Sequence, residues 1–235
     1  GDIANVLLLR AVHRLNRLIR PDLVVVAGDV LDDGDGPGGA EAMADMRAHL
    51  DLLRAPILAL PGNHDGPLPD FEEGFGCLPE WIDVNGYRFV IFVDAEEPNY
   101  NASRTEANFT LMERAREEFD GPLVAAQHVP VFPEGRTDSP FTYTNAPEVI
   151  EKMANTGYFM AVSGHYHPGF HVADSGMHFV CAPATCVAPF PITILDMEWD
   201  QTSGDRMDSG YPSPNVRHTH HYLRLFPVPS PQGGR

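Results

Sequence analysis

The chain has 235 residues and a net charge of −17, and 43% of its residues are hydrophobic. This size and composition predict one globular domain over residues 1–226, followed by a polar tail over 227–235. So acidic a chain is a poor partner for extended nucleic acid or anionic lipid, which bind basic surfaces. No apolar run reaches the roughly 18 residues that cross a membrane. The compartment and the oligomeric state stay open, and for the compartment we favour the cytoplasm.

Helical and strand patterns alternate through the first two thirds of the chain. Residues 5–19 place apolar side chains at helical spacing, and Pro21 ends that helix. We then expect strands at 22–29, 57–60, 88–94, 122–128 and 158–165, and helices near 40–54, 105–119 and 146–155. Beyond residue 168 only short strands follow. Helix and strand alternation followed by a run of strands favours a mixed, layered α/β sandwich.

Polar side chains follow four of the expected strands, each at the point where the strand ends. Asp29 ends the first strand, and Asn63-His64-Asp65 (63–65) follows the second. His128 ends a later strand, and His165 and His167 follow the strand after that. Ligands in open α/β folds bind at the carboxyl ends of strands. If these strands are neighbours, the polar side chains meet on one rim.

This mixture of donor types indicates a metal site. Imidazole nitrogen, carboxylate and amide oxygen together suit a first-row divalent ion better than they suit magnesium. A carboxylate bridges two cations through its two oxygens, and two histidines on a loop can reach two different ions. The sequence therefore predicts a two-metal site of the kind that clamps both oxygens of an in-line displacement at phosphorus.

Four motifs in order give the chain a family resemblance. They are G-D-x-x-D at 28–32, G-N-H-D at 62–65, His128, and G-H-x-H at 164–167. Together they resemble the calcineurin-like metallophosphoesterases, over residues 22–170. The resemblance implies an α/β fold, a four-layer α-β-β-α sandwich of two mixed β-sheets flanked by helices.

The same resemblance implies the roles of the metal ligands. Asp29 would bridge two divalent or mixed-valence ions of Mn, Fe or Zn. Asn63, His128 and His165 would complete the ligands of one ion, and His167 would bind the other. Taken alone, each aspartate could be an ordinary turn residue and each histidine an ordinary core residue. Metal binding is favoured because all of the motifs occur together.

The resemblance also implies a catalytic residue outside the metal ligands. His64 would contact the phosphoryl oxygen or protonate the leaving group. Asp32 and Asp65 would orient the ligands through hydrogen bonds. The reaction would be attack of a metal-activated hydroxide at phosphorus.

One motif of the family does not occur in this sequence, either because the residues that carry it precede Gly1, which we favour, or because the protein has lost one metal. The family begins with a strand that ends in D-x-H, whose Asp and His complete the first metal site. Here the chain begins GDIANVLLL, with Ala4 where that His would stand. We expect Asp2 to cap or fray a helix rather than to bind metal.

The expected function is hydrolysis of a small phosphodiester or phosphomonoester, with cyclic nucleotides among the candidates. A long aromatic loop follows His128, and from it we expect Arg136, Phe141 and Tyr143 to contact substrate. An ordinary surface loop is the alternative for that segment. Because D-x-H is missing, the alternatives for the whole chain are a catalytically silent scaffold with this fold and a metal-binding protein.

Further histidines lie in the late strands. His171 and His178 could line the site, although core or surface positions suit them as well. His218, His220 and His221 could bind metal adventitiously, but a strand near the surface explains them more simply.

Overall fold

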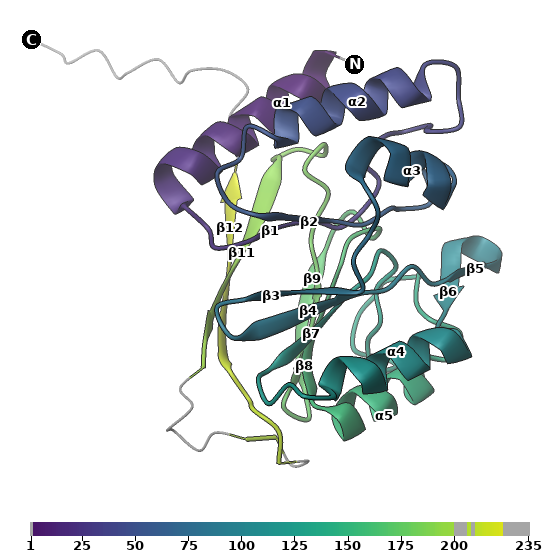
Figure 1. The fold of residues 1–235 in the computed structure, drawn as a ribbon, viewed down its shortest axis with the longest axis vertical. Coiled ribbons are helices and arrows are strands. Elements are labelled where there is room, and N and C mark those ends of the chain that lie inside the picture. The colour runs from purple at the N-terminus through teal and green to yellow at the C-terminus, as the bar shows by residue number, and fades with distance from the viewer. Residues whose placement is uncertain (1, 200–205, 208–209, 223–235) are drawn as a thin grey trace, which may run out of the picture.

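The computed structural model describes residues 2–199, 206–207 and 210–222. Its largest element is a six-stranded mixed sheet in the order β3-β4-β7-β8-β10-β9. Two helices, α4 (Glu106–Arg116) and α5 (Ala146–Thr156), cover one face of this sheet (Figure 1). The six strands are β3 (Trp81–Val84), β4 (Tyr87–Ile91), β7 (Leu123–Ala126), β8 (Tyr158–Ser163), β9 (Phe170–Asp174) and β10 (Met177–Cys181).

A second β-layer lies against this sheet as two separate pairs of strands. Strands β1 (Val24–Val26) and β2 (Ile57–Ala59) are parallel. Strands β11 (Pro191–Glu198) and β12 (Asn215–Tyr222) form an antiparallel hairpin. A groove of about 640 Å³, lined by residues of β1 and β11, separates the two pairs.

Three helices lie on the far side of the second layer. They are α1 (Asp2–Arg14), α2 (Gly39–Leu50) and α3 (Leu68–Phe75), seen at the top of Figure 1. Leu7 and Ala11 of α1 are buried against Phe190 and Ile192, at the start of β11. The mixed α/β class and its layers are thus confirmed, except that the predicted second sheet is divided, because β1 and β11 do not pair with each other.

Burial explains the composition of the central strands. Every residue of β7 (LVAA) and of β8 (YFMAVS) is buried. Strands covered on both faces have no polar face, so their sequences are continuous apolar runs rather than alternating ones. The two strands therefore hold the loops that follow them on a rigid base.

The elements begin and end close to the predicted positions, with local differences. The first helix ends at Arg14, and a π-turn over Leu15–Ile19 continues it to Arg20, whose φ is 54°. An additional hairpin, β5 (Ala95–Glu97) and β6 (Asn101–Ser103), was not expected. Among the described residues no helix is long and apolar enough to cross a membrane. The predicted tail over 227–235 lies outside the described residues.

Candidate metal and phosphate site

The four strands with polar ends bring those ends to one place. Asp29 follows β1, Asn63 follows β2, His128 follows β7 and His165 follows β8. Because β1 and β2 are parallel, as are β7 and β8, each pair directs its loops to the same edge. The predicted rim therefore forms between the two β-layers.

The centre of the site is Nε2 of His128. It lies 3.1 Å from Oδ2 of Asp29 and 3.2 Å from Oδ1 of Asn63. Nδ1 of His165 lies 3.0 Å from the same nitrogen. One ligand atom from each of Asp29, His128 and His165 falls within 4.8 Å of the other two. Among the described residues this is the one group of His, Cys, Asp or Glu that meets that criterion.

The tautomer of His128 shows why this arrangement suits a cation. Its Nδ1 lies 2.7 Å from the carbonyl oxygen of Ala27, which can only accept, so Nδ1–H is the donor. In the neutral ring Nε2 then presents a lone pair to the oxygens of Asp29 and Asn63. A proton on Nε2 could form a hydrogen bond to only one of these oxygens. A divalent ion could bind the nitrogens and the oxygens together. The residues present therefore fit a metal ion.

The pKa shifts agree with a site built for positive charge. Burial raises the pKa of Asp29, but the hydrogen bond and charge of His128, together with the backbone N–H and charge of His64, lower it overall. Burial opposes charge on His128, yet the Asp29 carboxylate raises the pKa of that imidazole. Burial and the charge of His128 lower the pKa of His165 to about 4. His165 is consequently a neutral imidazole near neutral pH, as a metal ligand must be.

Two glycines allow the loops to approach so closely. A Cβ on Gly62 would collide with the Asp29 carboxylate and the His128 ring. Gly28 has φ +88°, and a Cβ there would lie 2.6 Å from the backbone nitrogen of Gly62. The ligands Asp29 (φ 55°) and His165 (φ 66°) are themselves left-handed. Such conformations cost energy and occur where the surrounding structure imposes them, often at functional sites.

His64 lies at the exposed rim beside this group. Its backbone N–H donates to Oδ1 of Asp29 at 3.0 Å. Its Nδ1 lies 2.9 Å from the backbone carbonyl of Asp32, which fixes Nδ1–H as the donor. The ring is therefore held by one nitrogen, and Nε2 is left for a ligand. For Asp32 it is the backbone, not the carboxylate, that makes this contact.

Asp65 joins the two loops that carry the ligands. Its side chain accepts hydrogen bonds from the backbone N–H groups of Leu31 at 3.0 Å and of Gly62 at 2.8 Å. The residue is 1% exposed, and burial raises the pKa of its carboxyl group. Asp65 thus orients the ligands through the backbone, without touching their side chains in the described contacts.

The remaining predicted ligand lies outside the group. His167 is exposed and is not among the atoms that converge. Asp2 belongs to α1, on the far side of the second β-layer, so it is not part of the site. The described residues therefore supply one compact set of donors, with no equivalent of the D-x-H motif.

The three predicted substrate contacts have different locations. Phe141 packs edge-on against His165, with ring centroids 4.5 Å apart, and so forms a wall of the site. Tyr143 was predicted wrongly, because it is buried and its hydroxyl donates to Oδ2 of Asp94 at 2.6 Å. For Arg136 the described contacts lie elsewhere: its guanidinium donates to the carbonyl oxygen of Ala173 and pairs with Asp174, and its contact with substrate stays a prediction. Ala173 and Asp174 are the last two residues of β9. The site lies near the other end of that strand, because Phe170 pairs with Cys181, which in turn pairs with the last residue of β8.

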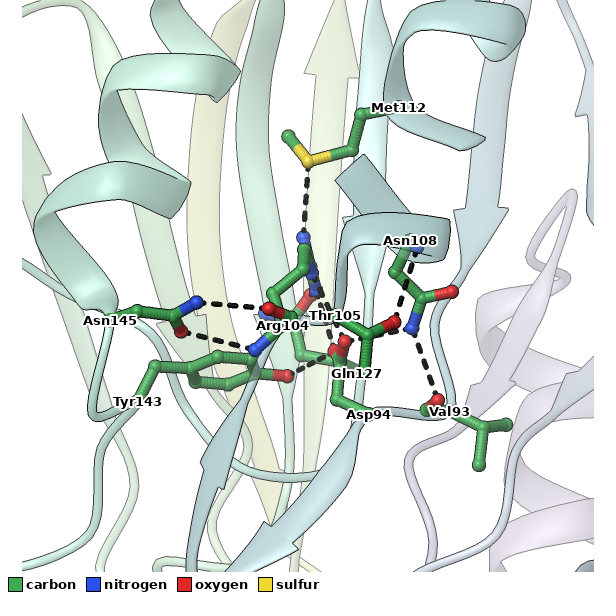
Figure 2. A network of polar contacts seen from close by, with 9 residues as sticks. All are labelled: Val93, Asp94, Arg104, Thr105, Asn108, Met112, Gln127, Tyr143 and Asn145. Carbon is green, nitrogen blue, oxygen red and sulfur yellow. Dashed lines mark hydrogen bonds and ion pairs between the residues drawn. The ribbon is translucent and has the colours of Figure 1, made fainter. Parts of the chain in front are cut away.

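Sequence reasoning missed a buried network directly behind the site. Arg104 forms two hydrogen bonds to the Asp94 carboxylate, at 2.8 and 3.3 Å, and a third to Gln127 at 3.3 Å (Figure 2). Asp94 also accepts from Asn108 and Tyr143. Although burial opposes the charge of Arg104, the carboxylate of Asp94 raises its pKa. Since Gln127 precedes His128, the network anchors the loop of that ligand.

Comparison with known proteins supports the same class of site. The calcineurin-like phosphoesterase family model matches residues 5–169. A protein of Synechococcus sp. named as a probable cyclic nucleotide phosphodiesterase is 27% identical over 174 residues, which cover 71% of this chain and 66% of that protein. One of the same name from Xenorhabdus bovienii is 26% identical, covering 71% of this chain and 55% of that protein. The chain thus spans between about half and two thirds of these relatives.

Solved structures share the fold. A dimetal phosphatase from Danio rerio superposes with a TM-score of 0.65 at 17% identity, covering 77% of this chain and 78% of that one. The TT1561 protein of Thermus thermophilus gives 0.63 at 12% identity, covering 95% of both chains. The match of the family model over most of the chain, with the motifs of that model at one rim, is decisive: this chain belongs to the calcineurin-like phosphoesterase family.

Proposed function

We propose that the chain is a metal-dependent hydrolase of a small phosphodiester or phosphomonoester. The observation that carries this proposal is the convergence of Asp29, Asn63 and His165 on Nε2 of His128. Neutral nitrogen and anionic or amide oxygen donors around one point bind a first-row divalent ion. His64, beside that point, is exposed to solvent.

In this proposal the four converging residues hold the metal, with Mn, Fe or Zn as the candidate ions. Asp29 and exposed His167 would hold a second ion. When bound, such ions supply Lewis acidity and a water molecule of lowered pKa. The chain itself supplies the orientation: Ala27 fixes the ring of His128, and Asp65 fixes the backbone of Gly62.

His64 acts on the substrate in this proposal. Its Nδ1–H is committed to the carbonyl of Asp32, so the ring cannot rotate freely. When the ring carries a second proton, its Nε2–H is the group that donates a hydrogen bond to a phosphoryl oxygen or a proton to the leaving group. Phe141, packed against His165, restricts the space on the opposite side of the donors.

The substrate class follows from charge and from the relatives. With a net charge of −17, the chain would repel a long polyanion. The curated relatives are named probable cyclic nucleotide phosphodiesterases, which supports a small cyclic phosphodiester as the first substrate to test. We propose no membrane partner and no extended nucleic acid partner, and a cytoplasmic location is the working assumption for such a substrate.

The test is turnover by the metal-loaded chain on three substrates. They are bis(p-nitrophenyl) phosphate, p-nitrophenyl phosphate and a 3′,5′-cyclic nucleotide, each with Mn²⁺ and with Zn²⁺. We expect hydrolysis of at least one, and His64→Ala should lower kcat by about 10²- to 10⁴-fold, as loss of a general acid does. Metal content should be unchanged in that variant. His13→Ala, an exposed histidine of α1, is the matched control and should retain full turnover.

A silent scaffold is the second candidate, and one observation favours it. The described residues contain a single converging donor group, and Asp2 lies in α1 rather than at the site. If that group binds one equivalent of metal and no substrate is turned over by the loaded chain, the scaffold or metal-binding role replaces the hydrolase. Turnover that depends on His64 would exclude both alternatives.

A further inference from the structure

A second cluster of histidines lies away from the candidate metal and phosphate site. His171 and His178 come from β9 and β10, and His218 and His220 come from β12. Nε2 of His171 lies 3.0 Å from Nδ1 of His178. The ring of His218 lies between its neighbours, with its centroid 5.0 Å from that of His171 and 4.5 Å from that of His220. The four rings therefore form one continuous array.

The strand registers explain why these side chains share one space. His171 pairs with Val180 and His178 pairs with Ala173, so both histidines point to the same face of the antiparallel pair. His218 and His220 are two residues apart on β12, and alternate residues of a strand share a face. The β11–β12 hairpin packs this face against β9, so histidines from two different sheets meet there.

The cluster is distinct from the site at His128. Cys181 of β10 pairs with Ser163, the last residue of β8, at the end that leads to the site. His178 lies three residues earlier on β10, which at about 3.3 Å per residue places it on the order of 10 Å away along the strand. An ion held at His178 would therefore not be shared with His128.

The protonation states of the cluster favour metal binding. Burial lowers the pKa of His171 and of His178, and burial together with the charge of His220 lowers the pKa of His218 to about 4. The rings are thus neutral near neutral pH and offer lone pairs. Nε2 of His218 is buried and has no hydrogen-bond partner among the described residues. A buried polar atom without a partner costs free energy that a ligand can recover.

We propose that His171, His178 and His218 form a second binding site for a first-row transition ion such as Zn²⁺. Zinc is bound by imidazole nitrogen at about 2.0–2.1 Å in tetrahedral geometry, which separates two ligand nitrogens by roughly 3.3 Å. The 3.0 Å between His171 and His178 is close to that separation. As the rings stand, the ligand nitrogens of the cluster are not all within 4.8 Å of one another, so the site forms when the ring of His218 rotates toward His171 and His178. His220 lies next to His218 and is the fourth ligand in this proposal.

The test compares zinc binding by the full chain and by variants of the cluster. Metal-free protein is dialysed against limiting Zn²⁺, and the bound equivalents are measured by elemental analysis. We expect His171→Gln and His218→Gln each to lose one equivalent relative to the parent, with phosphoesterase turnover unchanged. Gln keeps a polar side chain of similar size but offers no imidazole. The matched control, His13→Gln, should bind as much zinc as the parent.

A thermal measurement keeps the test valid if a variant is poorly folded. Zn²⁺ should raise the unfolding temperature of Asp29→Asn, in which the cluster is intact. The increase should be smaller in His218→Gln than in the parent. Equal zinc content in the parent and both glutamine variants would overturn the proposal, as would a thermal shift that depends on Asp29 alone.

Discussion

Two polar clusters lie back to back in this protein, on adjacent residues of the loop after β7. Gln127 belongs to the buried network of Arg104 and Asp94, whereas His128 is the centre of the metal-ligand group. Both clusters contain a carboxylate from a residue that follows an apolar strand, Asp94 after β4 and Asp29 after β1. Their surroundings make them different.

In the buried network, donors meet acceptors. The Asp94 carboxylate accepts from Arg104, Asn108 and Tyr143, and its side chain is 3% exposed. At the candidate metal-ligand group, one ring nitrogen faces several acceptors: Nε2 of His128 lies near an oxygen of Asp29 and an oxygen of Asn63, and a single proton on it can bond only one of them. A cluster that satisfies itself is structural, whereas one whose lone pairs converge requires a ligand. Four predictions test that distinction.

The largest effect is expected on stability, from Arg104→Met. It leaves the Asp94 carboxylate buried and unpaired, which costs about 3–5 kcal/mol of the free energy of unfolding. Denaturant unfolding measures this loss. Arg114→Met is the matched control, since the Arg114–Glu80 pair is about half exposed and solvent screens the attraction between its charges. Equal losses of unfolding free energy in the two variants would show that the buried ion pair contributes no more to stability than the exposed one.

The next effect is expected on activity, from Asp29→Asn. The amide keeps the shape of the side chain but loses the charge. Because Asp29 is a direct ligand in our proposal, we expect turnover to fall by at least the roughly 100-fold that losing a ligand's hydrogen-bond partner costs. Metal content should also fall, while the unfolding temperature changes far less than in Arg104→Met. Asp33→Asn, in the exposed acidic loop, is the control. Full activity in Asp29→Asn would remove this carboxylate from the site.

A third, smaller effect concerns pH and the late histidines. The pKa of His218 is lowered to about 4 from an ordinary value near 6.5. Between these pH values the unfolded chain binds more protons, so the stability that neutral His218 contributes is complete above about pH 6.5 and is lost as the pH falls toward 4. We expect the unfolding temperature to fall less from pH 7 to pH 5 in His218→Gln than in the parent. A parallel decline in both would contradict this assignment.

The smallest effect is expected from Arg136→Ala. The guanidinium is about half exposed and bonds only to Ala173 and Asp174 in the described contacts, so its loss should cost about 1 kcal/mol or less. Steady-state kinetics should give the same KM and kcat as the parent. An increase in KM would show that Arg136 contacts substrate. The comparison between the two clusters would then rest on Asp94 and Asp29 alone.

The sequence predicted the position of most helices and strands, and it predicted that the candidate ligands lie together. Apolar runs such as YFMAVS are diagnostic because a strand buried on both faces admits no polar residue. The reason for the glycine at position 62 is tertiary, since a Cβ there would strike Asp29 and His128, which lie far from it in the sequence. The prediction of Tyr143 as a substrate contact failed because loop residues follow no periodic pattern that would show which of them are buried.

What the sequence determined is therefore which residues stand at the ends of strands, because hydrophobic pattern and turn chemistry are local properties. Which of these ends meet was decided only by the tertiary structure. Asp94 and Asp29 give the same signal in the sequence, yet sheet order and helix α4 direct one into a buried ion pair and the other to the rim. The division of the second β-layer and the meeting of His171 with His218 likewise depend on contacts between segments far apart in the chain.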